Sequence, residues 1–278
     1  MKKRLIFNFY IDENWKENHM NKIHLYCLKH YRDVFNEMIF MVSLNDTENK
    51  ELIYDFENHI LSLELCPNIQ FIIKKNHVFR EAKNFYEEIA LKLRYLDGLT
   101  FFGHNKGITN YFNPDFNKKD VEKWVTSMYY GCLCDVKEME LYLTDCRKLA
   151  YGTLLDEISI NGVENAEWNN SLSVWLGERR YFYMGTFFWL NCNMIDYYLQ
   201  NSNTDIPKLV DRWYAENFFA NIFDSFHCSS FNDNRTLNYV QGGCKNIDAI
   251  INLSFREKIG EYNDFHNNVI NAINYDRD

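Results

Sequence analysis

Short apolar runs alternate with amphipathic stretches along the first hundred residues of the chain. The apolar runs are rich in β-branched and aromatic residues and predict strands, whereas the stretches between them carry apolar residues at helical spacing. The expected strands cover residues 4–11, 38–44, 69–73 and 99–102, and the expected helices cover residues 14–35, 48–63 and 80–96. Strands that alternate with helices of this length are joined by right-handed crossovers, so we expect an α/β fold with a mostly parallel sheet flanked by helices.

The pattern is less regular after residue 110. A polar stretch at residues 158–168 is expected to be a loop, and the Asn-rich carboxyl end is expected to be a loosely held tail. Gly185 and Thr186 interrupt an aromatic strand that starts at Tyr181. The other expected elements are helices at 120–133, from Val136, at 193–199 and at 208–223, and strands at 149–155 and 246–253.

Composition and charge argue against several classes of protein, namely nucleic-acid-binding, transmembrane and secreted proteins. The net charge of -9 argues against binding along a nucleic-acid backbone. No apolar run approaches the roughly 20 residues that span a bilayer, and the amino terminus has no cleavage site of a signal peptide. Eight scattered cysteines match neither a zinc spacing nor a disulfide framework, so we expect buried free thiols. These features predict a cytoplasmic protein without a transmembrane segment, able to lie at the inner membrane face as a peripheral protein.

Polar residues gather where the predicted strands end. In open α/β sheets, ligands bind at the carboxyl edge of the parallel strands. The side chains expected at that edge are Tyr10, Asp12, Ser43, Asn45, Lys74, Asn76, His104 and Lys106. No GxGxxG or Walker A loop is present, which weakens the dinucleotide and ATP-loop interpretations.

The turn after the fourth predicted strand carries the side chains at this edge that are best suited to binding a ligand. Gly103 and Gly107 permit backbone angles that other residues avoid, and His104, Asn105 and Lys106 between them supply an imidazole, an amide and an ammonium. A solvated turn with no function is an equally good interpretation of this stretch taken alone.

Four stretches together resemble a known family. They are His104-Asn105-Lys106-Gly107 after a strand, Trp124 with Met128 on a helix, Gly185-Thr186-Phe187-Phe188-Trp189 leading into a helix, and Arg212-Trp213-Tyr214-Ala215-Glu216. In this order they are similar to motifs of bacterial and viral GT-A-like glycosyltransferases from polysaccharide (capsule and lipopolysaccharide) biosynthesis loci. The resemblance spans roughly residues 81 to 227.

The resemblance implies a GT-A-like, Rossmann-type sheet in a single domain over residues 1–278. Residues 1–110 would be the nucleotide-sugar-binding half, residues 111–230 the acceptor-side half and residues 231–278 a C-terminal extension. A UDP- or GDP-sugar donor and a glycan or glycolipid acceptor are the implied partners. Donor-binding candidates are Tyr10, Asp12, Lys74, His104, Asn105, Lys106 and Gly107, and acceptor-binding candidates are Gly185, Thr186 and Trp189.

Departure of a nucleoside diphosphate needs a positive partner, which is usually Mn²⁺ or Mg²⁺ held by an Asp-x-Asp pair. That pair is absent after the fourth predicted strand, where the chain has His-Asn-Lys. Either Lys106 supplies the charge, with Lys74, Lys75 or Arg80, or a metal is held by other ligands such as His227. A structural histidine is the alternative role for His227.

Two further candidates carry the proposed chemistry, each with a structural alternative. Trp189 is either a wall on which a sugar ring stacks or a core residue, as Phe187 and Phe188 are expected to be. Glu216 is either the base that takes a proton from the acceptor hydroxyl in an inverting transfer or a solvated carboxylate. Aromatic neighbours in the sequence would raise the pKa of such a base.

The predicted function is therefore a nucleotide-sugar-dependent glycosyltransferase, of the hexosyltransferase type, in surface polysaccharide biosynthesis. A nucleotidyltransferase on a similar sheet is the first alternative, although no glycine-rich amino-terminal loop supports it. A non-catalytic carbohydrate-binding protein is the second alternative, and the missing Asp-x-Asp pair is its best support.

Overall fold

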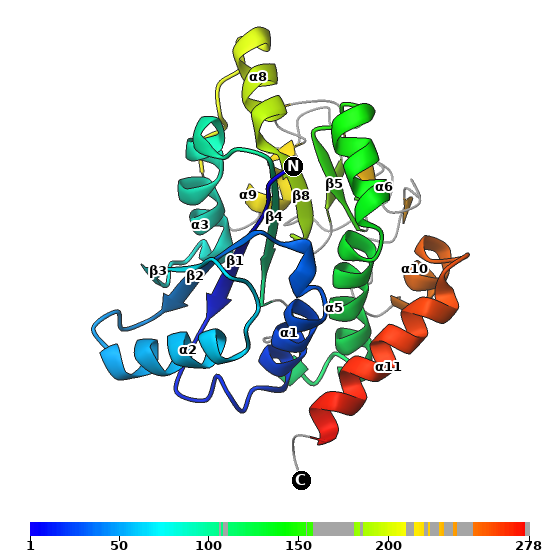
Figure 1. Cartoon of the computed structure of the whole chain (residues 1–278). Helices are drawn as coiled ribbons and strands as arrows, with labels where there is room; N and C mark the ends of the chain where they lie inside the picture. The colour runs from blue at the N-terminus through cyan, green and yellow to red at the C-terminus, as the bar shows by residue number, and fades with distance from the viewer. Residues whose placement is uncertain are drawn as a thin grey trace.

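Four parallel strands form the first part of the main sheet (Figure 1). β1 (Lys3–Tyr10) pairs with β2 (Glu37–Leu44) on one side and with β4 (Leu99–His104) on the other, and β3 (Ile69–Lys75) lies outside β2. The computed structural model describes residues 1–105, 107, 111–153, 155–157, 181–183, 186–209, 214–219, 222, 228–230, 236–237 and 247–275. The expected α/β fold with a mostly parallel sheet flanked by helices is confirmed, and the four strands lie within two residues of their predicted bounds.

The connecting helices are α1 (His19–His30), α2 (Lys50–Ser62) and α3 (Arg80–Glu88), followed by the short helix η2 (Ala90–Tyr95). α1 begins five residues later than predicted because Asn18 caps it, accepting hydrogen bonds from the amides of Met20 and Asn21. The predicted third helix divides at Ile89 into α3 and η2. A short helix η1 (Arg32–Val34) leads from α1 to β2.

The sheet continues beyond β4 with one reversed strand. β8 (Phe188–Asn191) runs antiparallel between β4 and β5 (Ala150–Gly152), and β9 (Cys228–Ser230) is parallel to β5. The order among the described strands is therefore β3-β2-β1-β4-β8-β5-β9. A second, three-stranded sheet contains β10 (Thr236–Leu237), β6 (Leu155–Glu157) and β7 (Tyr181–Tyr183).

Two predicted strands prove to be divided between these sheets. The expected strand at 149–155 separates into β5 and β6, and the aromatic strand from Tyr181 separates into β7 and β8. The second division occurs where the sequence predicts an interruption. Thr186 there has φ of +63°, which takes the chain out of the extended conformation.

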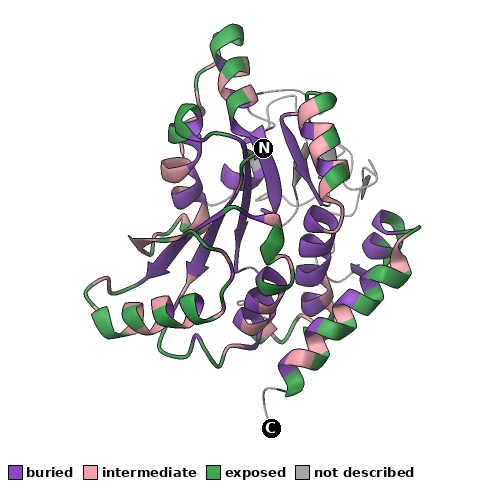
Figure 2. Ribbon diagram, viewed as in Figure 1, coloured by how far each residue is buried: buried purple, intermediate pink, exposed green. Residues whose placement is uncertain are grey.

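Helices cover both faces of the main sheet. Rings of α1, α2 and α5 (Lys118–Leu133) pack on the face that carries Phe7, whereas Phe85 of α3 packs on the face that carries Phe102 and Phe188. α9 (Tyr214–Asn217) lies against α3, and α8 (Cys192–Ser202) lies against η2. The central strands are buried along almost their whole length, as Figure 2 shows. α6 (Val136–Glu140) and the π-helical turn η3 (Leu141–Asp145) follow α5.

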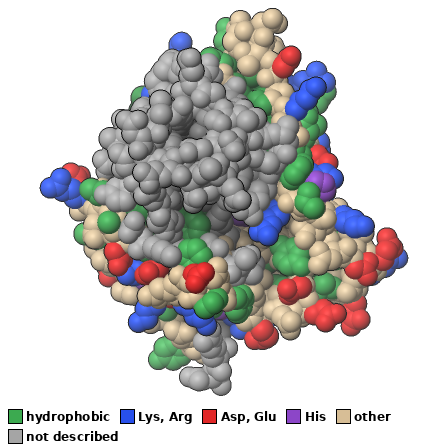
Figure 3. All heavy atoms as spheres, turned by 180° about the vertical axis from the view of Figure 1, so that it is seen from behind, with side chains coloured by type: hydrophobic (Ala, Val, Ile, Leu, Met, Phe, Trp, Pro, Cys, Tyr) green, Lys and Arg blue, Asp and Glu red, His purple; other side chains and the backbone are tan. Residues whose placement is uncertain are grey.

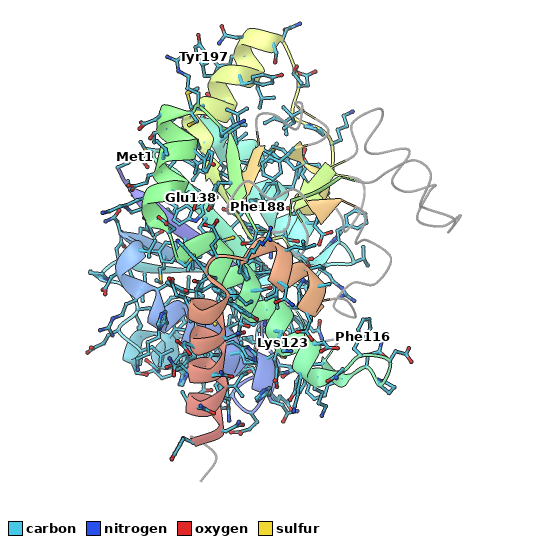
Figure 4. The ribbon with its side chains drawn as sticks, turned by 90° about the vertical axis from the view of Figure 1, so that its right-hand side faces the viewer. Met1, Phe116, Lys123, Glu138, Phe188 and Tyr197 are labelled. Carbon is cyan, nitrogen blue, oxygen red and sulfur yellow. The ribbon has the colours of Figure 1, made fainter. Side chains whose placement is uncertain are left out.

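Near the carboxyl end the structure has two helices that the sequence did not predict. α10 (Ile247–Ser254) replaces the strand expected at 246–253, and α11 (Ile259–Tyr275) replaces the loosely held tail. α11 packs across α1 and α5, and Figure 4 shows it together with α10 beside α5. Its apolar residues fall at helical spacing and are buried: Tyr262, Phe265, Val269 and Ile273. None of the helices in the described part of the chain is long and apolar enough to cross a membrane.

Candidate functional site

The carboxyl ends of β1 and β4 mark the position where a ligand is expected in a sheet of this order. The chain adds strands outward from β1 through β2 to β3, and then returns to the other side of β1 with β4. Such a reversal leaves a crevice outside the carboxyl ends of the two neighbouring strands, and α/β proteins bind ligands there. Tyr10 and His104 end these two strands.

A buried polar cluster lies behind this edge, on the face of the sheet that α3 covers. The Asn84 side-chain amide donates to the Asn8 side-chain oxygen and, at 2.9 Å, to Ser43 Oγ. Ser43 Oγ in turn donates to Asn8 Oδ1 at 3.0 Å. All three residues are at most 5% exposed. Because buried polar groups need such partners, these bonds hold α3 in one position against β1 and β2.

Asn105 was predicted to bind the nucleotide, but the structure gives its side chain a structural role. Its Oδ1 accepts a hydrogen bond from the Tyr10 amide at 3.0 Å, and its Nδ2 donates to the Tyr10 carbonyl at 2.9 Å and to Asn21 Oδ1 at 3.0 Å. The side chain is buried. Asn105 therefore joins the ends of β1 and β4 to α1, and its polar atoms are used within the protein.

Tyr10 and Asp12 lie at the predicted edge. Tyr10 is half-buried, and its hydroxyl accepts a hydrogen bond from Asn45 Nδ2 at 3.2 Å; Asn76 Nδ2 donates to Asn45 Oδ1 at 3.0 Å. A row of polar side chains thus follows the ends of β1, β2 and β3. Asp12 is exposed, and its carboxylate accepts a hydrogen bond from the Asn14 amide. Both residues remain candidates for contact with a base or a ribose.

His104 ends β4 as a buried histidine next to a carboxylate. It is 7% exposed, and its Nδ1 lies 3.8 Å from Oε1 of Glu81, which belongs to the first turn of α3. In the sheet His104 is level with Asn8 on β1. Its ring centroid is 6.0 Å from that of Phe187. An imidazole and a carboxylate therefore meet at the carboxyl end of β4.

The antiparallel strand β8 brings the later half of the chain to the same edge. Phe102, two residues before the end of β4, pairs with Phe188, and Thr186 comes two residues before β8 begins. Thr186 is fully buried, and its hydroxyl donates to Oε1 of Glu216 at 3.2 Å. Glu216 is 8% exposed. The sequence predicted both residues as site residues, and the structure places them together near the end of β4.

Lys74 lies on the expected strand, but its charge is already paired. Its ammonium is 3.1 Å from a carboxylate oxygen of Glu87 and 2.6 Å from one of Glu88, both on α3. Burial alone would lower the pKa of Lys74, but the hydrogen bonds from its ammonium to Glu88 and Glu87 outweigh it and raise the pKa. With two carboxylates around it, this ammonium is a weak candidate for neutralising a diphosphate.

The two glycines of the turn have different structural roles. Gly107 has φ of +88°, and a Cβ there would lie 3.0 Å from Val121 of α5 and 3.2 Å from Met20 of α1. Gly103 has no positive φ, but a Cβ there would lie 3.1 Å from the ring of Phe7. The predicted need for unusual backbone angles is thus confirmed for Gly107, whereas Gly103 is required by close packing.

Trp189 is a core residue, which corrects its assignment as an acceptor-binding residue. Its side chain is fully buried, and its ring stacks on Phe35 with centroids 5.6 Å apart. Its indole nitrogen donates to the Cys132 carbonyl at 2.8 Å. A ring packed in this way has no face left for a sugar. The core positions expected for Phe187, Phe188, Trp124 and Met128 are confirmed.

Several predicted residues lie outside the part of the chain that the structure describes. They are Lys106, Gly185 and His227. Among the described residues, no group of three or more His, Cys, Asp or Glu side chains is arranged to hold a metal ion. The seven described cysteines are free; four of them are buried as expected, whereas Cys66 and Cys134 are half-buried and Cys146 is exposed. The one Asp-x-Asp sequence of the chain, Asp276-Arg277-Asp278, is at the carboxyl end and also lies outside the described residues.

Sequence reasoning missed three polar residues of the site. Asn8 sits among apolar residues in a strand that is buried on both faces, and such a placement is a usable signal for a buried polar role. Glu81 and Asn84 are three residues apart on α3, so they share one face of the helix. Only the packing of α3 shows that this polar pair faces the sheet.

Acidic and basic side chains are mixed along the lower rim of the face seen in Figure 3, on the side of the molecule opposite to the view of Figure 1. This mixture agrees with the net charge of -9 in giving no support to a nucleic-acid interface.

Comparison of the sequence with models of known protein families finds no match, and comparison with curated proteins finds none either.

Proposed function

We propose that the protein is a GT-A-like glycosyltransferase that moves a sugar from a nucleotide-sugar donor to a glycan or lipid-linked glycan acceptor in surface polysaccharide biosynthesis. The observation that supports this most directly is the 3.2 Å hydrogen bond from the buried Thr186, two residues before β8, to the buried carboxylate of Glu216 on α9. The carboxyl ends of β1 and β4 are the position where α/β proteins bind nucleotides. A donor site and a candidate base therefore share one edge of the sheet.

In this proposal the base of a UDP- or GDP-sugar lies near Tyr10 and Asp12, and its diphosphate extends toward His104. Glu216 takes the proton from the acceptor hydroxyl while that oxygen attacks the anomeric carbon from the side opposite the diphosphate. The bond between the sugar and the diphosphate breaks, and its electrons leave with the diphosphate. The hydroxyl of Thr186 holds the carboxylate of Glu216 in place through the 3.2 Å hydrogen bond.

The test is a thermal-shift panel of nucleotides and nucleotide sugars, with and without Mn²⁺, followed by assays of sugar transfer. A ligand that binds only the folded protein raises the melting temperature, by an amount set by its concentration relative to its Kd. We expect UDP- or GDP-sugars to raise it and adenine dinucleotides to leave it unchanged. Absence of any shift with nucleoside diphosphates would contradict the proposal, as would a crystal structure with nucleotide bound away from β1 and β4.

A further inference from the structure

The pair formed by His104 and Glu81 has no role in the proposed proton transfer. His104 stands at the reversal point of the sheet, on the face covered by α3 and α9. Its Nδ1 is 3.8 Å from Glu81 Oε1, and both side chains are largely buried, with exposures of 9% and 16%. A carboxylate at this distance offsets part of what burial costs the charged form of an imidazole.

The position of Glu81 is set by the buried cluster below it. Asn84 follows Glu81 by three residues on α3 and donates to Asn8 and Ser43. Asn8 is the residue on β1 that is level with His104 on β4. Asn8 therefore both holds α3 through Asn84 and lies level with His104. These contacts fix α3 in the position that brings Glu81 close to His104.

A positively charged side chain at the end of β4 would have a role in the proposed reaction, because the departing diphosphate is negative. The diphosphate that leaves during sugar transfer carries negative charge and requires a cationic partner. Lys106, the cation expected there, lies outside the described residues, and Lys74, expected beside it, is held by Glu87 and Glu88. Lys75 and Arg80 are exposed at the surface.

We propose that His104, oriented by Glu81, contacts the diphosphate of the nucleotide in its imidazolium form and stabilises the diphosphate as it departs. His104 is then a ligand-binding group, and Glu81 is a positioning residue that acts through it. As the bond between sugar and diphosphate breaks, the electron pair moves to the diphosphate oxygen, while the imidazolium donates a hydrogen bond and keeps its proton. This inference rests on the proposed function, because it assigns the diphosphate part of the same donor site.

Other ionisable groups enter the test. Glu81 faces His104 from α3, and Glu216 on α9 accepts a hydrogen bond from Thr186. Lys106 follows two residues later and lies outside the described residues. The variants therefore change His104 and Glu81 separately.

The experiment measures UDP and GDP affinity by calorimetry between pH 5.5 and 8.5 for the parent, His104→Gln and Glu81→Gln. A phosphate group itself titrates near pH 6, so the parent affinity is divided by that of His104→Gln at each pH. We expect the ratio to be about 10 or more at low pH, as for a hydrogen bond between charged groups, and to fall toward 1 as the imidazolium deprotonates. Glu81→Gln should move this fall to lower pH, since a neutral amide no longer favours the charged ring.

Two controls separate this role from a general loss of structure. Uridine and guanosine lack the diphosphate, so their affinities should be the same for the parent and His104→Gln at every pH. Glu51→Gln removes one negative charge from an exposed position on α2 and should leave UDP binding unchanged. Thermal unfolding of each variant shows whether it is folded.

The outcomes distinguish this inference from the proposed function. A ratio that stays near 1, or that does not change with pH, in a parent that binds nucleotide and transfers sugar would overturn the role of His104 alone. An unchanged pH profile in Glu81→Gln would remove the positioning role of Glu81. A parent that binds neither UDP nor GDP would refute the proposed function, and the inference with it.

Discussion

Substitution of Gly131 by alanine tests how closely helix α5 approaches strand β5. A Cβ at Gly131 would lie 2.0 Å from Thr153 Oγ1, 2.8 Å from its Cγ2 and 2.9 Å from its Cβ. Thr153 is 1% exposed, and its hydroxyl lies 3.4 Å from Cys132 Sγ. The clash therefore includes the Cβ of Thr153, and a rotation of the Thr153 side chain about its Cα–Cβ bond does not move that atom.

The expected change in stability is a balance of two terms. Alanine in place of glycine in a helix interior stabilises it by about 1 kcal/mol. Overpacking a well-packed site costs about 1–3 kcal/mol, and contacts this short place Gly131→Ala at the upper end. We therefore expect a net destabilisation of about 2 kcal/mol, which lowers the melting temperature of a protein of this size by about 3–4 °C.

Gly260 provides the matched control, because no atom lies within 4 Å of a Cβ built there and the residue belongs to α11. Gly260→Ala should raise stability by up to about 1 kcal/mol. The assay is chemical and thermal unfolding followed by circular dichroism. Combining Gly131→Ala with Thr153→Ala should cost less than the sum of the single changes, since the closest contacts are removed. A Gly131→Ala protein as stable as Gly260→Ala would refute the close approach.

Three further predictions concern the site and the response to acid. Asn105→Asp should destabilise the protein by about 2 kcal/mol or more in urea unfolding, because a carboxylate would replace the amide that donates to two oxygens; unchanged stability would refute the structural role. Glu216→Gln should retain nucleotide binding but lose turnover by roughly 100-fold or more, and near-normal turnover would show that Glu216 is not the base. Burial lowers the pKa of His30, His59 and His266 below the ordinary value of 6.5. A lowered histidine pKa means that protonation favours the unfolded chain, so stability should be full above pH 6.5 and fall as the pH decreases, and a melting temperature that rises between pH 7 and 5 would contradict this.

The amino-terminal half was predictable because its signals are local. Each strand is a short apolar run, each helix repeats apolar residues at helical spacing, and the connections between parallel strands have a fixed hand. The edge that carries Tyr10 and His104 follows from these rules alone. The use of Asn105 within the protein could not be predicted, because an amide at a strand end has the same sequence signal whether its partner is backbone or ligand.

The carboxyl-terminal half depends on contacts that local patterns do not contain. β8 lies between β4 and β5 and pairs Phe188 with Phe102. No residue spacing in the sequence predicts this pairing. Trp189 shows the same limit, since an aromatic residue on a strand can face the core or a ligand. The segment 246–253 was predicted as a strand, although Ile247, Ile250 and Ile251 also fit one face of a helix.

The position of β8 has a consequence for synthesis of the protein on the ribosome. β1 to β4 and their helices are complete by residue 104, but the outer edge of β4 has no partner until residues 188–191 emerge. A buried, aromatic strand with an open edge can pair with other chains, and folding intermediates that expose such edges aggregate. At about 5–20 residues per second, the growing chain carries this open edge for several seconds. Translation pauses between β4 and β8 should therefore lower the yield of folded protein more than equal pauses after β8.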